Sequence, residues 1–118
     1  MNYESIEKKR KEYVNLLKKS LKIVKERLKG KVEKIIVFGS YFKRKDLFTD
    51  LDLLIIMETD KPFIERIKEI YSLLHLPVDA DILCYTPFEI EKLKERNFFK
   101  KILKEGIILY EKRKNRRR

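Results

Sequence analysis

Residues 35–57 read IIVFGSYFKRKDLFTDLDLLIIM and contain two apolar runs separated by a polar loop. The first run ends at Gly39-Ser40, and the second opens at Asp52, two residues after Asp50. Short apolar runs bounded by Gly and polar residues predict buried β-strands. Carboxylates beside a core are costly unless a cation or a hydrogen bond pairs with them. The stretch therefore predicts two buried strands with a polar site where one ends and the next begins.

The sequence on either side predicts helices alternating with further strands. Apolar residues recur at spacings of three and four before Gly30, a pattern typical of an amphipathic helix. Asp60 is the expected N-cap of a later helix, and Thr86-Pro87-Phe88-Glu89 reads as a capping box with Pro at its first turn. The expected elements are helices over 3–29, 41–45, 61–76, 87–96 and 97–105 and strands over 32–38, 52–57, 79–85 and 107–110.

Length and charge suggest how the chain is organised. Its 118 residues are enough for one domain. The net charge of +11 lies at the ends, because residues 1–31 carry +7 and residues 112–118 carry +6, whereas residues 32–111 carry −2. We expect one domain over 1–111, comprising an N-terminal helix (1–31) and a core (32–111), and a disordered basic tail over 112–118. The basic ends favour a polyanion such as RNA as a partner, and a solvated helix and tail explain them equally well.

Several classes of protein and site are excluded or disfavoured by composition. Cys84 is the only cysteine and His75 the only histidine, so neither a disulfide framework nor Ser-His-Asp catalysis is expected. No apolar run reaches the about 20 residues of a membrane helix, and the N-terminus does not read as a signal peptide. We expect a cytoplasmic protein without a membrane partner. Abundant Lys and Glu with no Gln is typical of thermophile proteins.

The carboxylates near the two strands predict a metal site. Residues i and i+2 of a strand share a face, so Asp50 and Asp52 are neighbours with like charge. Oxygen ligands at this spacing suit Mg²⁺, and a third carboxylate would complete a two-metal site for phosphate chemistry. The third predicted strand offers Asp79 and Asp81, which share a face, so periodicity leaves both open. Gly39 and Ser40 suit phosphate binding, since Gly lets backbone N–H groups approach an anion.

These motifs together resemble the DNA polymerase β-like nucleotidyltransferase superfamily. Gly39-Ser40 is followed after nine residues by Asp50-x-Asp52 and then by an Asp in a later strand. More narrowly, the chain is similar to the minimal nucleotidyltransferases of archaea and bacteria. This resemblance extends over residues 32–111 and includes DILCYTPFE at 81–89 and FFKKILKEGIILYE at 98–111.

The resemblance implies a fold, an activity and a site. The fold would be α+β, a mixed β-sheet flanked by helices like the polymerase β palm. The activity would be transfer of a nucleoside monophosphate from ATP or another nucleoside triphosphate, with two Mg²⁺ ions. The family's metal-binding and catalytic carboxylates would be Asp50, Asp52 and Asp81. The nucleotide's phosphates would be held by Gly39, Ser40, Lys43 and Arg44.

The same resemblance suggests an acceptor. Minimal nucleotidyltransferases often pair with a HEPN-type toxin and act as its antitoxin by transferring AMP to it, so a small helical protein is the implied partner. Family members often read G-S-x-x-R-G, whereas Lys43 and Arg44 stand here at the Arg and Gly positions. Lys lacks the bidentate phosphate contact of Arg. This departure favours an alternative, a non-catalytic binding module that is either a contact antitoxin or an RNA-binding protein with a degenerate site.

Overall fold

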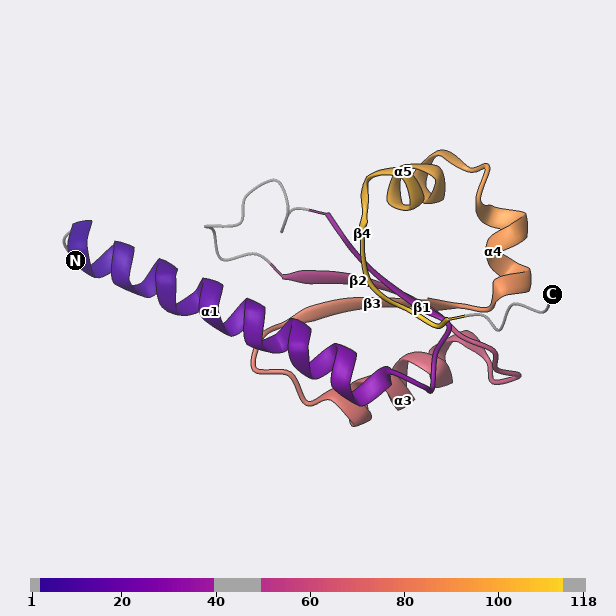
Figure 1. The fold of residues 1–118 in the computed structure, drawn as a ribbon, viewed down its shortest axis with the longest axis horizontal. Helices are drawn as coiled ribbons and strands as arrows, with labels where there is room; N and C mark the ends of the chain where they lie inside the picture. The colour runs from indigo at the N-terminus through magenta and orange to yellow at the C-terminus, as the bar shows by residue number, and fades with distance from the viewer. Residues whose placement is uncertain (1–2, 40–49, 114–118) are drawn as a thin grey trace.

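A computed structural model describes residues 3–39 and 50–113 of the chain. The elements follow the expected order, so the predicted α+β class is confirmed (Figure 1). They are α1 (Tyr3–Leu28), β1 (Lys34–Phe38), β2 (Leu51–Ile56), α3 (Phe63–Leu74), β3 (Ala80–Tyr85), α4 (Pro87–Leu93), α5 (Asn97–Glu105) and β4 (Ile107–Glu111). The expected short helix at 41–45 lies outside the described residues.

The four strands form one mixed sheet in the order β3-β2-β1-β4. β1 is antiparallel to both β2 and β4, whereas β2 and β3 are parallel. A parallel pair needs a long crossover connection, and α3 provides it. Phe38 is the register partner of Asp52, and Asp52 is also the register partner of Asp81. The register therefore brings the end of β1 and the beginnings of β2 and β3 to one end of the sheet.

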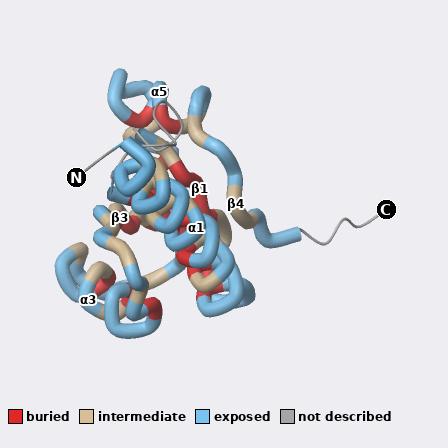
Figure 2. Tube along the Cα trace, turned by 90° about the vertical axis from the view of Figure 1, so that its left-hand side faces the viewer, coloured by how far each residue is buried: buried red, intermediate tan, exposed pale blue. Residues whose placement is uncertain are grey.

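Side-chain alternation divides the core between the two faces of the sheet. Leu51, Leu53 and Ile55 of β2 pack with the buried residues of α1 and α3. Leu54 and Ile56 pack instead with residues of α4 and α5. Figure 1 shows these two pairs of helices on opposite sides of the sheet, and Figure 2 shows buried residues concentrated along β1. Asp52 has the same parity as Leu54, so its side chain lies on the face covered by α5.

The fully buried residues of α1 all lie in its second half. Its buried residues are Leu17, Ser20, Val24 and Leu28. Tyr3 and Ile6 continue the same stripe but are exposed, because the first turns extend beyond the end of the sheet (Figure 1). That is the end where β1 stops and β2 and β3 begin.

The start of α3 differs from the sequence expectation. Pro62 occupies the N-cap position with extended dihedral angles, and no side chain caps the helix, so the prediction that Asp60 is the N-cap was wrong. The helix ends at His75, which adopts the left-handed conformation with φ 45°. The predicted capping box of α4 is confirmed, since Thr86 and Glu89 exchange side-chain-to-backbone hydrogen bonds of 3.1 and 2.8 Å.

Candidate active site

Two carboxyl groups meet at the end of the sheet where β2 and β3 begin. Asp52 and Asp81 are each the second residue of their strands and are direct register partners. Burial is the largest cause that raises the pKa of Asp52, followed by the negative charges of Asp81 and Asp50 and then by a side-chain hydrogen bond to Asp81. Burial and the neighbouring negative charges disfavour an ionised Asp52 unless a cation binds beside it.

Asp50 and Asp79 lie one residue before these strands, and both are exposed. The charge of Asp50 also raises the pKa of Asp52, so Asp50 lies near the pair. Asp50, Asp79 and Asp81 line a pocket of about 530 Å³ beside Tyr71 and His75. The structure thus brings Asp50, Asp52 and Asp81 to one end of the sheet. The positions of Asp79 and Asp81, which periodicity left equivalent, also differ in the structure. Asp81 is the register partner of Asp52, whereas Asp79 precedes the strand.

Gly39 forms the third part of this site, directly after β1. It has φ +82°, a conformation that L side chains rarely adopt. A Cβ atom built there would clash with Oδ2 of Asp52. Glycine is therefore needed at this position to leave room for the Asp52 carboxyl group. Ser40, Lys43 and Arg44, the other expected phosphate contacts, lie outside the described residues.

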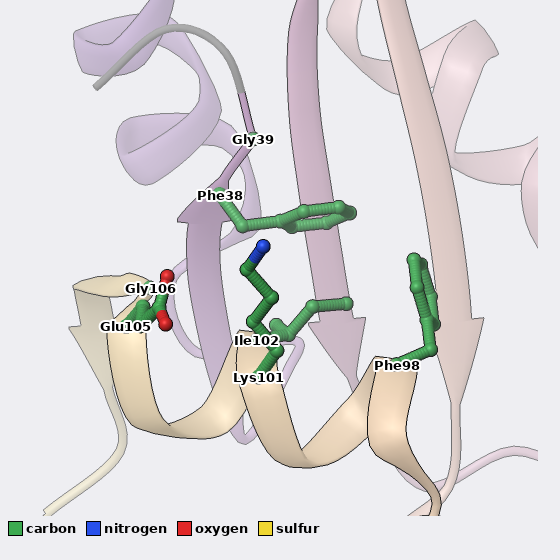
Figure 3. A pocket seen from close by; sticks show the side chains of 7 residues that line it. All are labelled: Phe38, Gly39, Phe98, Lys101, Ile102, Glu105 and Gly106. Atoms are coloured by element: carbon green, nitrogen blue, oxygen red, sulfur yellow. The ribbon is translucent and has the colours of Figure 1, made fainter. Parts of the chain in front are cut away.

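A second pocket opens on the α5 face next to Gly39. It has a volume of about 320 Å³, and its lining residues are Phe38, Gly39, Phe98, Lys101, Ile102, Glu105 and Gly106 (Figure 3). Sequence reasoning missed it, because the strand end and the helix that form it are about 60 residues apart in the sequence. The sequence indicated Phe98 and Ile102 only as apolar residues of the helix predicted over 97–105.

A comparison with protein families agrees with this geometry. The sequence matches the family described as "Polymerase beta, Nucleotidyltransferase" over residues 7–115. The chain belongs to this family. It is accordingly a nucleotidyltransferase, whose substrate is a nucleoside triphosphate. A comparison with curated proteins gave no match.

Nucleotidyltransferases generally use a divalent metal, and the acidic end of the sheet suits one. Carboxylate oxygens are the ligands that Mg²⁺ prefers, and a bound cation would offset the negative charges of Asp81 and Asp50 that act on Asp52. Within residues 3–39 and 50–113, however, no three His, Cys, Asp or Glu side chains are already grouped closely enough to hold an ion. The side chains of Asp50, Asp52 and Asp81 would have to come closer together for a nucleotidyltransferase metal site to form.

The remaining candidates for chemistry have structural roles in this nucleotidyltransferase. His75 is the C-cap residue of α3. Cys84 is fully buried, and burial raises the pKa of its thiol to about 11, so it is a poor nucleophile at neutral pH. Among the helices of the described residues, none combines the length and the apolar character that crossing a bilayer demands.

Proposed function

We propose that this nucleotidyltransferase transfers AMP from ATP to a hydroxyl group of a partner protein, in a Mg²⁺-dependent reaction at Asp50, Asp52 and Asp81. The observation that carries the proposal is the hydrogen-bonded pair of Asp52 and Asp81 beside Gly39. Such a pair costs free energy by itself, since burial and like charge both disfavour ionisation. A site that binds cations offsets this cost when it is loaded.

The residues have separate tasks in the proposed reaction. Asp50, Asp52 and Asp81 would hold the metal together, and Gly39 would let the triphosphate approach the strand end. Bound divalent ions would neutralise the triphosphate and lower the pKa of the acceptor hydroxyl. The hydroxyl oxygen then bonds to the α-phosphorus, the bond from that phosphorus to the bridging oxygen breaks, and pyrophosphate leaves. Asp81 is exposed on an edge strand, which makes it our candidate for accepting the hydroxyl proton.

The proposed acceptor is a small helical protein of the HEPN type, which the chain would neutralise as an antitoxin. The similarity to minimal nucleotidyltransferases supports this partner. RNA is a second possible acceptor, supported by the net charge of +11. A binding module without catalysis is the alternative that Lys43 and Arg44 favour, because they replace the Arg and Gly of related sequences.

Labelled ATP separates these functions. The protein is incubated with Mg²⁺, ATP labelled at the α-phosphate and the product of the neighbouring gene. We expect label on the partner with the wild type and with Asp60→Ala, an exposed Asp outside the site. Asp50→Ala and Asp52→Ala should give none while still forming the complex. A complex without label from the wild type would support the binding module, and wild-type transfer by both site variants would refute the proposed site.

A further inference from the structure

The pocket between β1 and α5 adjoins the acidic end of the sheet. Phe38 lines this pocket and is the register partner of Asp52. Gly39 lines it as well and lies against the Asp52 carboxyl group. A ligand whose phosphates reach Gly39 and Asp52 can therefore place its other end in this pocket without leaving the protein surface.

The walls of the pocket suit a planar, partly polar group. Phe38 and Phe98 face each other edge to face with ring centroids 6.2 Å apart, and Phe98 is 55% exposed. The buried residue Ile102 contributes to the apolar wall between them. Lys101 and Glu105 lie one turn apart on α5, and neither has an ion-pair partner within the described part of the chain. Figure 3 shows the Lys101 side chain extending from α5 toward the end of β1.

We propose that this pocket holds the base and ribose of the donor nucleoside triphosphate, with Phe98 stacking on the base. The inference rests on the proposed function and adds the residues that recognise the nucleoside. The volume of about 320 Å³ lies at the lower end of small-molecule sites, which suits one nucleoside better than an acceptor polypeptide. Lys101 adds charge complementarity, because a cation near the strand end attracts the triphosphate. Glu105 and Lys101 offer an acceptor and donors for the polar edges of the nucleoside.

Equilibrium binding tests the pocket without relying on transfer. Binding of ATP and of inorganic tripolyphosphate is measured by calorimetry with Mg²⁺ for wild type, Phe98→Ala and Phe88→Ala. Phe88 is a matched control, since it is 69% exposed on α4 and lies outside the pocket lining. Stacking on an aromatic side chain contributes enough that we expect Phe98→Ala to weaken ATP binding roughly tenfold or more. Tripolyphosphate has no base, so its affinity should be unchanged, and Phe88→Ala should change neither.

Three results would overturn the inference. Equal ATP affinity in wild type and Phe98→Ala would show that Phe98 does not stack on the base. Equal affinity of the wild type for ATP and tripolyphosphate, or binding of neither, would show that the pocket takes no nucleoside. Loss of partner binding in Phe98→Ala with ATP binding intact would assign the pocket to the acceptor.

The experiments distinguish failure of the pocket assignment from failure of the proposed function. If the wild type labels its partner but Phe98→Ala binds ATP normally, the transfer reaction stands and the pocket fails. If ATP binding depends on Phe98 but no partner is labelled, the pocket stands and the proposed transfer to protein fails. Phe98→Leu preserves apolar volume without an aromatic face, and it replaces Phe98→Ala if that variant has a lower melting temperature.

Discussion

Asp52 and Asp81 lie directly opposite each other on the parallel strands β2 and β3, and their carboxyl groups are hydrogen-bonded. The contact places two acidic side chains next to the buried apolar residues of these strands. Burial is the largest cause of the raised pKa of Asp52, followed by the charges of Asp81 and Asp50. The site is therefore maintained at the expense of stability, and removing one charge should reveal that cost.

Asp52→Asn should raise the melting temperature at pH 7 and lower nucleotide transfer by about 100-fold or more. An acid whose pKa is raised by folding destabilises the fold once pH exceeds its unfolded pKa, and Asn removes this charge at nearly constant shape. The gain in melting temperature should shrink as pH falls below about 4, where wild-type Asp52 is protonated in both states. Thermal unfolding between pH 3 and 8 measures it, with Asp60→Asn as the control. A variant less stable than wild type at pH 7 would contradict the electrostatic account.

Gly39→Ala should destabilise the protein more than Gly30→Ala. Both glycines have φ +82°, so both substitutions incur the cost of a left-handed Ala, about 1–2 kcal/mol. A Cβ at Gly30 meets no atom within 4 Å, whereas one at Gly39 meets the Asp52 carboxyl group. The difference between the two free energies of unfolding, measured with urea, isolates that clash. Gly39→Ala should also impair ATP binding and transfer, and equal losses of stability would mean that Asp52 moves aside freely.

Arg66→Lys should lower the free energy of unfolding by about 1–3 kcal/mol. Arg66 joins α3 to α4 through two hydrogen bonds of 2.7 and 3.2 Å to Glu89, and it also donates to the Cys84 carbonyl of β3. Lys cannot make the bidentate contact. Urea unfolding measures the loss, and Arg96→Lys on the exposed surface is the control.

The Arg66 contact should also depend on pH in a definite direction. The hydrogen bond from Arg66 is the largest cause that lowers the pKa of Glu89. A lowered acid pKa contributes stability above the unfolded pKa, and this contribution disappears as pH falls through the folded pKa. The difference in stability between wild type and Arg66→Lys should therefore be smaller at pH 3 than at pH 7. A difference that grows on acidification would rule out the ion pair as its source.

Cys84 should react with thiol reagents only when the protein unfolds. It is buried, and desolvation is the main cause that raises its pKa to about 11. At pH 8 the native protein then offers little thiolate and no access to it. The reaction of Cys84 with a thiol reagent, monitored by absorbance, should be slow in buffer. In denaturant it should reach one labelled thiol per chain. Rapid labelling of the native protein would indicate that β3 opens locally.

Much of the fold could be predicted because the hydrophobic pattern is regular. The alternation around Leu51, Leu53 and Ile55 and the capping box at Thr86 are local signals, and both appear in the structure as expected. The same alternation predicted that Asp50 and Asp52 share a side, whereas in the structure β2 begins only at Leu51, one residue after Asp50. The N-cap of α3 was less predictable, since Asp60 and Pro62 are both suitable starts and only the chain path decides between them.

Register and distant packing could not be predicted from periodicity. Asp79 and Asp81 are equivalent in parity, and only the pairing of Leu51 with Ala80 places Asp81 opposite Asp52. The contact between Phe38 and Phe98 likewise depends on how α5 returns to the sheet. Sequence patterns report on neighbours within a few residues, whereas these relationships are fixed by the shape of the whole core.

The unequal anchoring of α1 along its length has a consequence for how the helix forms. An isolated helix of about 12–15 residues is marginal in water, so the first turns cannot be expected to hold their shape alone. The first turns instead form by extension of the helix from the part that Val24 and Leu28 anchor in the core, because that part already provides the helix nucleus. Amide exchange should therefore quicken steadily from Leu28 toward Tyr3. A molecule that binds the first turns of α1 should slow amide exchange there first. Exchange in this helix therefore reports binding at the acidic end of the sheet.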